Sequence, residues 1–137
     1  MKKKVKIILC IMGMLLVSIG KFLLCFIYET KYKKADRDTS FSPDGKYELI
    51  LQEVGEPDWP FGDGRGQVVL KQDKKTISQT AFELSNDGKR INSYCWKVTW
   101  NDDYVEIILS GEEQSDEQIL MLFNGTVKTR QLTETKG

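Results

Sequence analysis

The sequence predicts an all-β protein with one N-terminal transmembrane helix, followed by a small antiparallel β-sandwich or barrel of about seven strands. Two observations lead to this fold class. Residues 7–28 form an apolar run with a single charge, at Lys21, and a helix of this length matches a hydrocarbon core about 30 Å thick. Beyond them, apolar and polar residues alternate with a period of two in short stretches separated by turn residues, which is typical of antiparallel strands.

The apolar segment is predicted to be retained as a signal anchor. Lys21 lies towards its C-terminal end, so the ammonium can reach the interface. A secretory signal peptide cut after Gly20 is the alternative, but it would leave apolar residues 22–28 at a new N-terminus. A lipoprotein signal needs small residues before the lipidated cysteine, whereas Cys10 follows Ile-Leu and Cys25 follows Leu-Leu.

The anchor divides the chain into four parts. We expect a basic cytoplasmic N-terminus at residues 1–6, the single-pass span at 7–28, a juxtamembrane tether at 29–42 and an extracytoplasmic β domain at 43–137. Lysines flank the span on both sides, and the short basic N-terminus favours a cytoplasmic start, with the domain outside.

The charge distribution bears on partners. Residues 1–37 hold nine Lys or Arg against two acids, and the remaining residues hold eleven against eighteen. An acidic domain argues against a nucleic-acid partner, because phosphate binding needs clustered Lys and Arg. The basic residues beside the span are expected to lie against anionic lipid headgroups.

The predicted strands form a meander, for which we expect a sandwich, with a small barrel as the alternative. In residues 46–54, Tyr47, Leu49 and Leu51 share one face, and in 104–110 we expect Val105, Ile107 and Leu109 to face inward. In residues 91–100, Tyr94, Trp96, Val98 and Trp100 share one face, which predicts a central strand with these side chains in the core. The turn at Asn124-Gly125 is a strong hairpin signal. The predicted strands cover residues 46–54, 67–72, 76–84, 91–100, 104–110, 118–123 and 126–132.

The composition argues against several kinds of catalytic or metal site. The chain has no histidine, and Cys95 is the one cysteine of the domain, so a Ser-His-Asp triad, a zinc site and an internal disulfide are excluded. We therefore predict no enzyme, no metal and no cofactor. Oxygen ligands for calcium are present without an EF-hand pattern, and a solvated acidic surface is expected at Asp58, Asp63, Asp102, Asp103, Glu112, Glu113, Asp116 and Glu117.

The connection after the first predicted strand is the candidate binding loop. It places Trp59 and Phe61 beside prolines, with Asp58 before them and Arg65 after them. Stiff loops that expose aromatic rings are common recognition surfaces. The alternative is that both rings fold back onto the core. The glycines at 62, 64 and 66 are expected to give the loop backbone freedom.

Two motifs carry a resemblance to known proteins. The domain opens with Ser-Pro-Asp-Gly-Lys-Tyr at residues 42–47, and Trp-Lys-Val-Thr-Trp-Asn-Asp-Asp follows at 96–103. Together with the Lys-rich anchor, they resemble a group of small, uncharacterised membrane-anchored proteins of Gram-positive bacteria. The resemblance implies no activity. We expect a non-catalytic, membrane-tethered module that binds an envelope protein or component, or alternatively a domain that binds a small ligand or carbohydrate at the cell envelope. An envelope enzyme is the third and most distant alternative.

Overall fold

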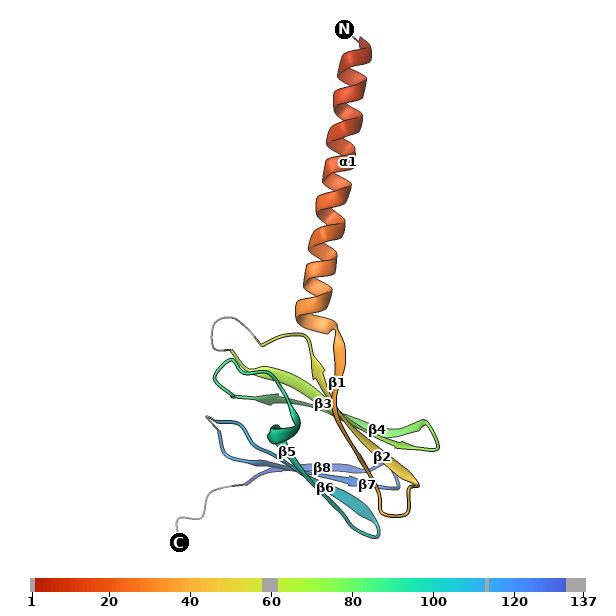
Figure 1. The fold of residues 1–137 in the computed structure, drawn as a ribbon, viewed down its shortest axis with the longest axis vertical. Helices are drawn as coiled ribbons and strands as arrows, with labels where there is room; N and C mark the ends of the chain where they lie inside the picture. Colours follow the sequence, from red (N-terminus) through yellow and green to blue (C-terminus); the bar gives the residue numbers. More distant parts are fainter. Residues whose placement is uncertain (1, 58–61, 113, 133–137) are drawn as a thin grey trace.

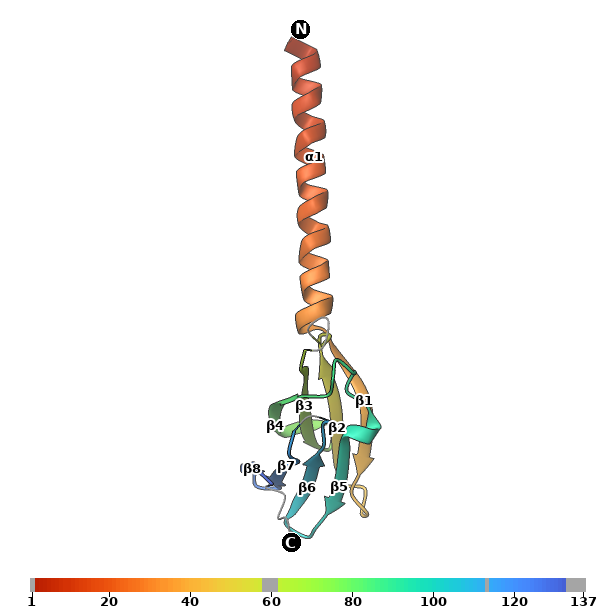
Figure 2. The ribbon, with the colours of Figure 1, turned by 90° about the vertical axis from the view of Figure 1, so that its left-hand side faces the viewer.

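The computed structural model describes residues 2–57, 62–112 and 114–132, which form a long helix and a β domain (Figure 1). Helix α1 spans Lys2–Ile27 and continues into one π-helical turn, η1, at Tyr28–Tyr32. The helix is long and apolar enough to cross a membrane, and it has no buried residue. Figures 1 and 2 show that it projects from one end of the β domain.

The β domain consists of two four-stranded antiparallel sheets, each a meander in chain order. The first sheet contains β1 (Lys34–Phe41), β2 (Tyr47–Val54), β3 (Gly64–Gln72) and β4 (Lys75–Leu84). The second contains β5 (Trp96–Trp100), β6 (Tyr104–Leu109), β7 (Glu117–Leu122) and β8 (Val127–Gln131), with a short 3₁₀ turn, η2 (Ser93–Cys95), before it. The coarse prediction of one helix followed by β structure is confirmed.

One core fills the space between the two sheets. Alternate residues of the central strands point into it, because successive side chains of a strand face opposite sides. The first sheet contributes Leu49, Leu51, Val68, Leu70, Phe82 and Leu84, and the second contributes Val105, Ile107, Leu109, Ile119 and Met121. The period-two pattern therefore predicted the inward faces of β2 and β6 correctly.

The described residues form eight strands, one more than predicted. The additional strand is β1, which occupies part of the expected tether. Its sequence is polar because its inward side chains bind indoles across the sandwich rather than packing as hydrophobes. The Trp96 Nε1–H donates to Asp38 Oδ2 at 2.8 Å, and the Trp100 Nε1–H donates to Ser40 Oγ at 2.9 Å. These bonds join the edge strand of the first sheet to the edge strand of the second.

The prediction of a central strand at residues 91–100 is wrong in two respects. Strand β5 begins only at Trp96, and it is an edge strand of its sheet. Tyr94 lies in η2 with 92% of its surface exposed, so it is not in the core. Trp96, Val98 and Trp100 do pack against the core, each partly buried. Cys95 is buried, as expected of a small hydrophobe.

The glycines at 64 and 66 belong to β3 and not to a loop. Gly66 is buried, and a Cβ at this position would lie 2.5 Å from Phe82 Cζ and 2.7 Å from the Gln52 carbonyl oxygen. The absence of a side chain at Gly66 allows the Phe82 ring to approach the sheet closely. Its role is therefore close packing rather than backbone freedom.

The helix meets the domain through a hydrogen-bonded joint. The Gly55 N–H donates to the Lys33 carbonyl at 2.8 Å, and the Glu56 N–H donates to the Thr30 carbonyl at 2.7 Å. Gly55 has φ +68°, and a Cβ there would lie 2.3 Å from the Thr30 oxygen. The residues that follow β2 therefore pack directly on η1, in the region where the sequence predicted a tether.

The two ends of the domain are named here by their distance from this joint. The helix-proximal end is where β1 begins and β2 ends. The helix-distal end holds the turn between β1 and β2, the turn between β5 and β6, and the turn after β7 (Figures 1 and 2).

Candidate functional site

The clearest candidate for a binding site is a cleft at the helix-distal end, here called the distal cleft. Its volume is about 390 Å³, towards the small end of the range for small-molecule sites. The cleft lies where three turns meet, so its wall comes from both sheets. Its lining residues are Ser42, Pro43, Asp44, Lys46, Tyr47, Trp100, Asn101, Asp102 and Phe123.

The turn between β1 and β2 forms one wall of the distal cleft. The buried Ser42 hydroxyl donates to Asp44 Oδ1 at 2.6 Å, and the Lys46 N–H donates to the same oxygen at 3.1 Å. The Tyr47 N–H donates to Ser42 Oγ at 3.0 Å. Gly45 adopts φ +75°, which favours glycine. Local hydrogen bonds therefore fix this wall before any ligand binds.

Three aromatic rings lie along the cleft. Tyr47 and Phe123 stack with ring centroids 3.9 Å apart and an interplanar angle of 9°. Trp100 lies 6.3 Å from Phe123 between centroids. The Phe123 N–H donates to the Asp103 carbonyl at 3.1 Å, which joins the turn after β7 to the turn between β5 and β6. All three rings are partly buried against the core and also line the cleft.

The polar groups of the cleft suit binding. Hydrogen bonds from the Ser42 hydroxyl and the Lys46 N–H hold the pKa of Asp44 below its ordinary value. Asp44 is therefore ionised at neutral pH and acts as an acceptor, not as a proton donor. Asn101 and Asp102 are exposed on the turn after Trp100, and they add an amide and a second carboxylate to the rim.

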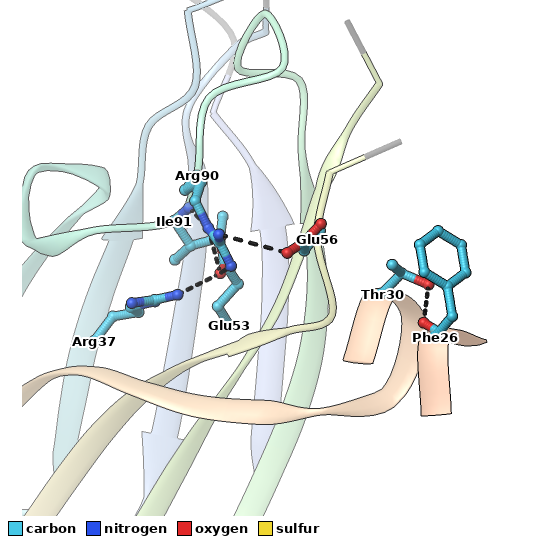
Figure 3. Close-up of polar contacts among 7 residues, drawn as sticks. All are labelled: Phe26, Thr30, Arg37, Glu53, Glu56, Arg90 and Ile91. Atoms are coloured by element: carbon cyan, nitrogen blue, oxygen red, sulfur yellow. Dashed lines mark hydrogen bonds and ion pairs between the residues drawn. The ribbon is translucent and has the colours of Figure 1, made fainter. Parts of the chain in front are cut away.

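A second charged cluster lies at the helix-proximal end, around Glu53. Its side chain is buried, with 1% of the residue surface exposed. Figure 3 shows Arg37, Arg90 and Ile91 converging on it. Oε1 accepts hydrogen bonds from Arg37 at 2.7 Å and from Arg90 Nη2 at 2.8 Å, and Oε2 accepts from the Ile91 N–H at 2.9 Å.

The balance of these contacts keeps Glu53 ionised. Burial alone would raise the pKa of Glu53, but the hydrogen bonds from Arg90, Arg37 and the Ile91 N–H outweigh burial and hold the pKa below its ordinary value. Both carboxylate oxygens already have donors. The cluster therefore ties β1 and the segment before η2 to the end of β2, and this is a structural role.

The predicted loop residues fall away from the distal cleft or outside the described residues. Asp58, Trp59 and Phe61 lie outside the described residues. Arg65 lies in β3 opposite Glu83, towards the helix-proximal end. Its Nε and Nη2 are enclosed without a hydrogen-bond partner among the described residues.

Arg65 lines a separate hollow of about 540 Å³. Glu83 and Glu117 line it as well, and burial raises the pKa of Glu117. The hollow and the distal cleft share no lining residue, so the structure does not bring Arg65 to the aromatic site.

The described acidic residues among those considered for calcium do not come together as a metal site. Asp63 accepts from the Ser85 hydroxyl at 3.0 Å, and Glu112 pairs with Lys89. Among residues 2–57, 62–112 and 114–132, no three Asp, Glu, Cys or His side chains are grouped to hold a metal ion. Of the other candidates, Glu113 lies outside the described residues.

Comparison with known proteins adds no relative. No protein-family model, curated protein or solved structure matches the chain. The site must therefore be interpreted from its own geometry. Sequence reasoning missed the distal cleft, although its signal was present: the motifs at residues 42–47 and 96–103, far apart in the chain, contribute most of the lining.

Proposed function

We propose that this chain is a membrane-anchored, non-catalytic binding module whose distal cleft binds a carbohydrate of the cell envelope. In this proposal α1 spans the membrane with its N-terminus in the cytoplasm, and the β domain lies outside. The observation that carries the proposal is the cleft itself, in which Tyr47, Trp100 and Phe123 lie beside Asp44 and the Asn101-Asp102 turn.

The chemistry of the cleft matches a sugar. One face of a pyranose ring carries C–H groups and stacks on an aromatic ring, while its hydroxyls donate to carboxylates and exchange hydrogen bonds with amides. Trp100 offers a ring, and Asp44, Asn101 and Asp102 offer acceptors. The cleft is small, which suits one or two sugar units rather than a flat protein surface.

The position of the cleft supports the same function. Its lining residues come from turns that lie at the end of the domain away from α1 (Figure 1). Strand β1 alone, with eight residues, extends about 26 Å away from the helix. The hydrogen bonds of Gly55 and Glu56 hold the β domain at the C-terminal end of the helix. A cleft held away from the bilayer can reach a polymer outside the membrane.

Glycan binding by the full chain in lipid nanodiscs tests the proposal. A panel of envelope glycans, including soluble peptidoglycan fragments, would be titrated while tryptophan fluorescence is recorded. Trp100→Ala should lower the affinity by about tenfold or more, since aromatic anchors dominate such sites. Asp87→Asn is the matched control for Asp102→Asn, because both aspartates are exposed in turns.

Two outcomes would contradict the carbohydrate proposal. The first is that no glycan binds. The second is that an envelope protein binds with an affinity that Trp100→Ala and Asp102→Asn leave unchanged, which would favour the protein-interaction alternative instead.

The location of the domain outside the membrane has its own test. A maleimide that cannot cross lipid should label a Ser115→Cys variant in intact cells, since Ser115 is exposed and Cys95 is buried.

A further inference from the structure

In the apolar part of α1, residues 7–27, the polar and charged groups lie on one side of the helix. Within residues 7–27, both thiols, the one hydroxyl and the one charged side chain are Cys10, Cys25, Ser18 and Lys21. At about 100° per residue, these four positions fall within an arc of about 80°, which also contains Ile7 and Met14. We call this side the Lys21 face; it consists of Ile7, Cys10, Met14, Ser18, Lys21 and Cys25.

The opposite side of α1 is apolar throughout. Helix α1 is continuous from Lys2 to Ile27, so the alignment of the Lys21 face is not interrupted by a break. The side chains within about 40° of the centre of the other side are Leu9, Met12, Leu16, Ile19, Leu23 and Ile27. A helix that only anchors a domain has no need to separate its residues in this way, because lipid surrounds it equally on every side.

The β domain leaves the Lys21 face uncovered. No residue of α1 is buried, and all those of the Lys21 face are exposed. Figures 1 and 2 show the helix extending beyond the domain. Lys21 lies six residues before the helix end at Ile27, about 9 Å in depth. Its stem can carry the ammonium towards the interface, but that movement gives no reason for Cys10, Ser18 and Cys25 to share its side.

Charge complementarity identifies the occupant of this face. Ionisable groups in membrane helices generally face a partner and pair with an opposite charge, and small polar groups form hydrogen bonds between helices. A second copy of this chain would bring two Lys21 ammonium groups together in a parallel pair. A carboxylate at the same depth would instead neutralise Lys21.

We propose that the Lys21 face docks against a transmembrane helix of another protein that carries an Asp or Glu at the depth of Lys21. This inference rests on the membrane span proposed above and not on the ligand of the distal cleft. The joint at Gly55 and Glu56 fixes the β domain on the end of α1, so the partner would lie on a defined side of the domain.

Association with synthetic peptides tests this proposal. The full chain, labelled on the domain, would be placed in phosphatidylcholine–phosphatidylglycerol vesicles with a labelled Leu-Ala transmembrane peptide. One peptide carries a Glu about six residues from the end of its apolar segment, and a matched peptide carries Gln. Energy transfer should show about tenfold stronger association with the Glu peptide, as expected for a paired polar contact in lipid.

Variants of the chain locate the contact. Lys21→Gln should abolish the preference for the Glu peptide, Lys21→Arg should retain it, and Ser18→Leu should weaken association. Ile19→Leu, on the apolar side, is the matched control. Equal association of the Glu and Gln peptides would overturn the proposal. Energy transfer between copies of this chain that exceeds transfer to the Glu peptide would overturn it as well, because the occupant would then be a second copy.

Discussion

The two ends of the β domain use charge in opposite ways. At the helix-proximal end, the carboxylate of Glu53 is buried and both its oxygens accept hydrogen bonds from Arg37, Arg90 and the Ile91 N–H. At the helix-distal end, Asn101 and Asp102 are exposed beside partly buried rings. A satisfied buried charge holds a structure together, whereas exposed polar groups beside aromatic rings remain available to a ligand.

The largest expected effect is the loss of Glu53. Glu53→Gln should lower the free energy of unfolding by about 3–5 kcal/mol, because Arg37 and Arg90 would lose their shared carboxylate. Urea unfolding of the full chain in micelles, followed by tryptophan fluorescence, measures this change. Glu48→Gln, on the same strand but on its other face, is the control and should cost less than about 0.5 kcal/mol. Equal effects of the two substitutions would remove the structural role assigned to Glu53.

The free energy of unfolding should depend on pH because Glu53 titrates differently in the folded and unfolded states. The pKa of Glu53 is lower in the folded state than its ordinary value of 4.5. The contribution of Glu53 to the free energy of unfolding is therefore fully present above pH 4.5 and is lost as the pH falls through the folded pKa. The effect of Glu117 on stability has the opposite pH dependence. Burial raises the pKa of Glu117, so this group makes the folded state more stable as the pH falls towards the ordinary pKa of a glutamate. Urea midpoints from pH 7 to pH 3 should therefore fall steeply in the native chain and less steeply in Glu53→Gln.

Trp96 tests how the two sheets are joined. Trp96→Ala should cost about 3 kcal/mol, near the lower limit for a large aromatic residue, since the ring is only partly buried. Trp96→Phe keeps a ring but removes the N–H donor to Asp38, and should cost about 1 kcal/mol. Thermal unfolding distinguishes the two variants. Unchanged stability of Trp96→Ala would show that β1 and β5 are not held together as described.

The joint at Gly55 should be sensitive to a single methyl group. Gly55→Ala adds a Cβ where the Thr30 oxygen lies 2.3 Å away, at a φ of +68°. We expect about 1–2 kcal/mol of destabilisation, with faster amide exchange at Gly55 and Glu56. Gly45→Ala also has positive φ but open space around its Cβ, so it controls for backbone conformation alone. If both variants leave the exchange of Glu56 unchanged, the joint is not tight.

The smallest effect on stability is expected at the distal cleft. Asp102→Asn should change the free energy of unfolding by less than about 0.5 kcal/mol, because Asp102 is exposed, while glycan affinity falls. Calorimetric titration and thermal unfolding of the same sample separate binding from folding. A large loss of stability would make Asp102 structural, and the contrast between the two ends would disappear.

The sequence predicted the apolar interior better than the polar contacts. Alternation found Leu49, Leu51 and Ile107 on inward faces because hydrophobic burial follows the period of a strand. It missed β1, since Asp38 and Ser40 accept indole N–H groups instead of packing, and only the tertiary structure reveals their partners. Tyr94 was misassigned because Asn92 Oδ1 accepts from its N–H and begins a 3₁₀ turn, a local signal that competes with strand periodicity.

The distal cleft could not be derived from the sequence for a related reason. Its residues come from turns that neither spacing nor periodicity brings together, and the register of β1 with β2 and of β5 with β6 had to be known first. The sequence did identify the motifs at residues 42–47 and 96–103. It did not predict that these two motifs lie side by side in the folded domain.

The most direct test is a nuclear magnetic resonance titration of the full chain in nanodiscs with a glycan that binds. The account predicts that the indole N–H signal of Trp100 and the amide signals of Lys46 and Asn101 shift, while the Arg90 Nε–H and Ile91 N–H signals do not. Shifts centred on Arg90 and Ile91, with the Trp100 signal unchanged, would contradict it.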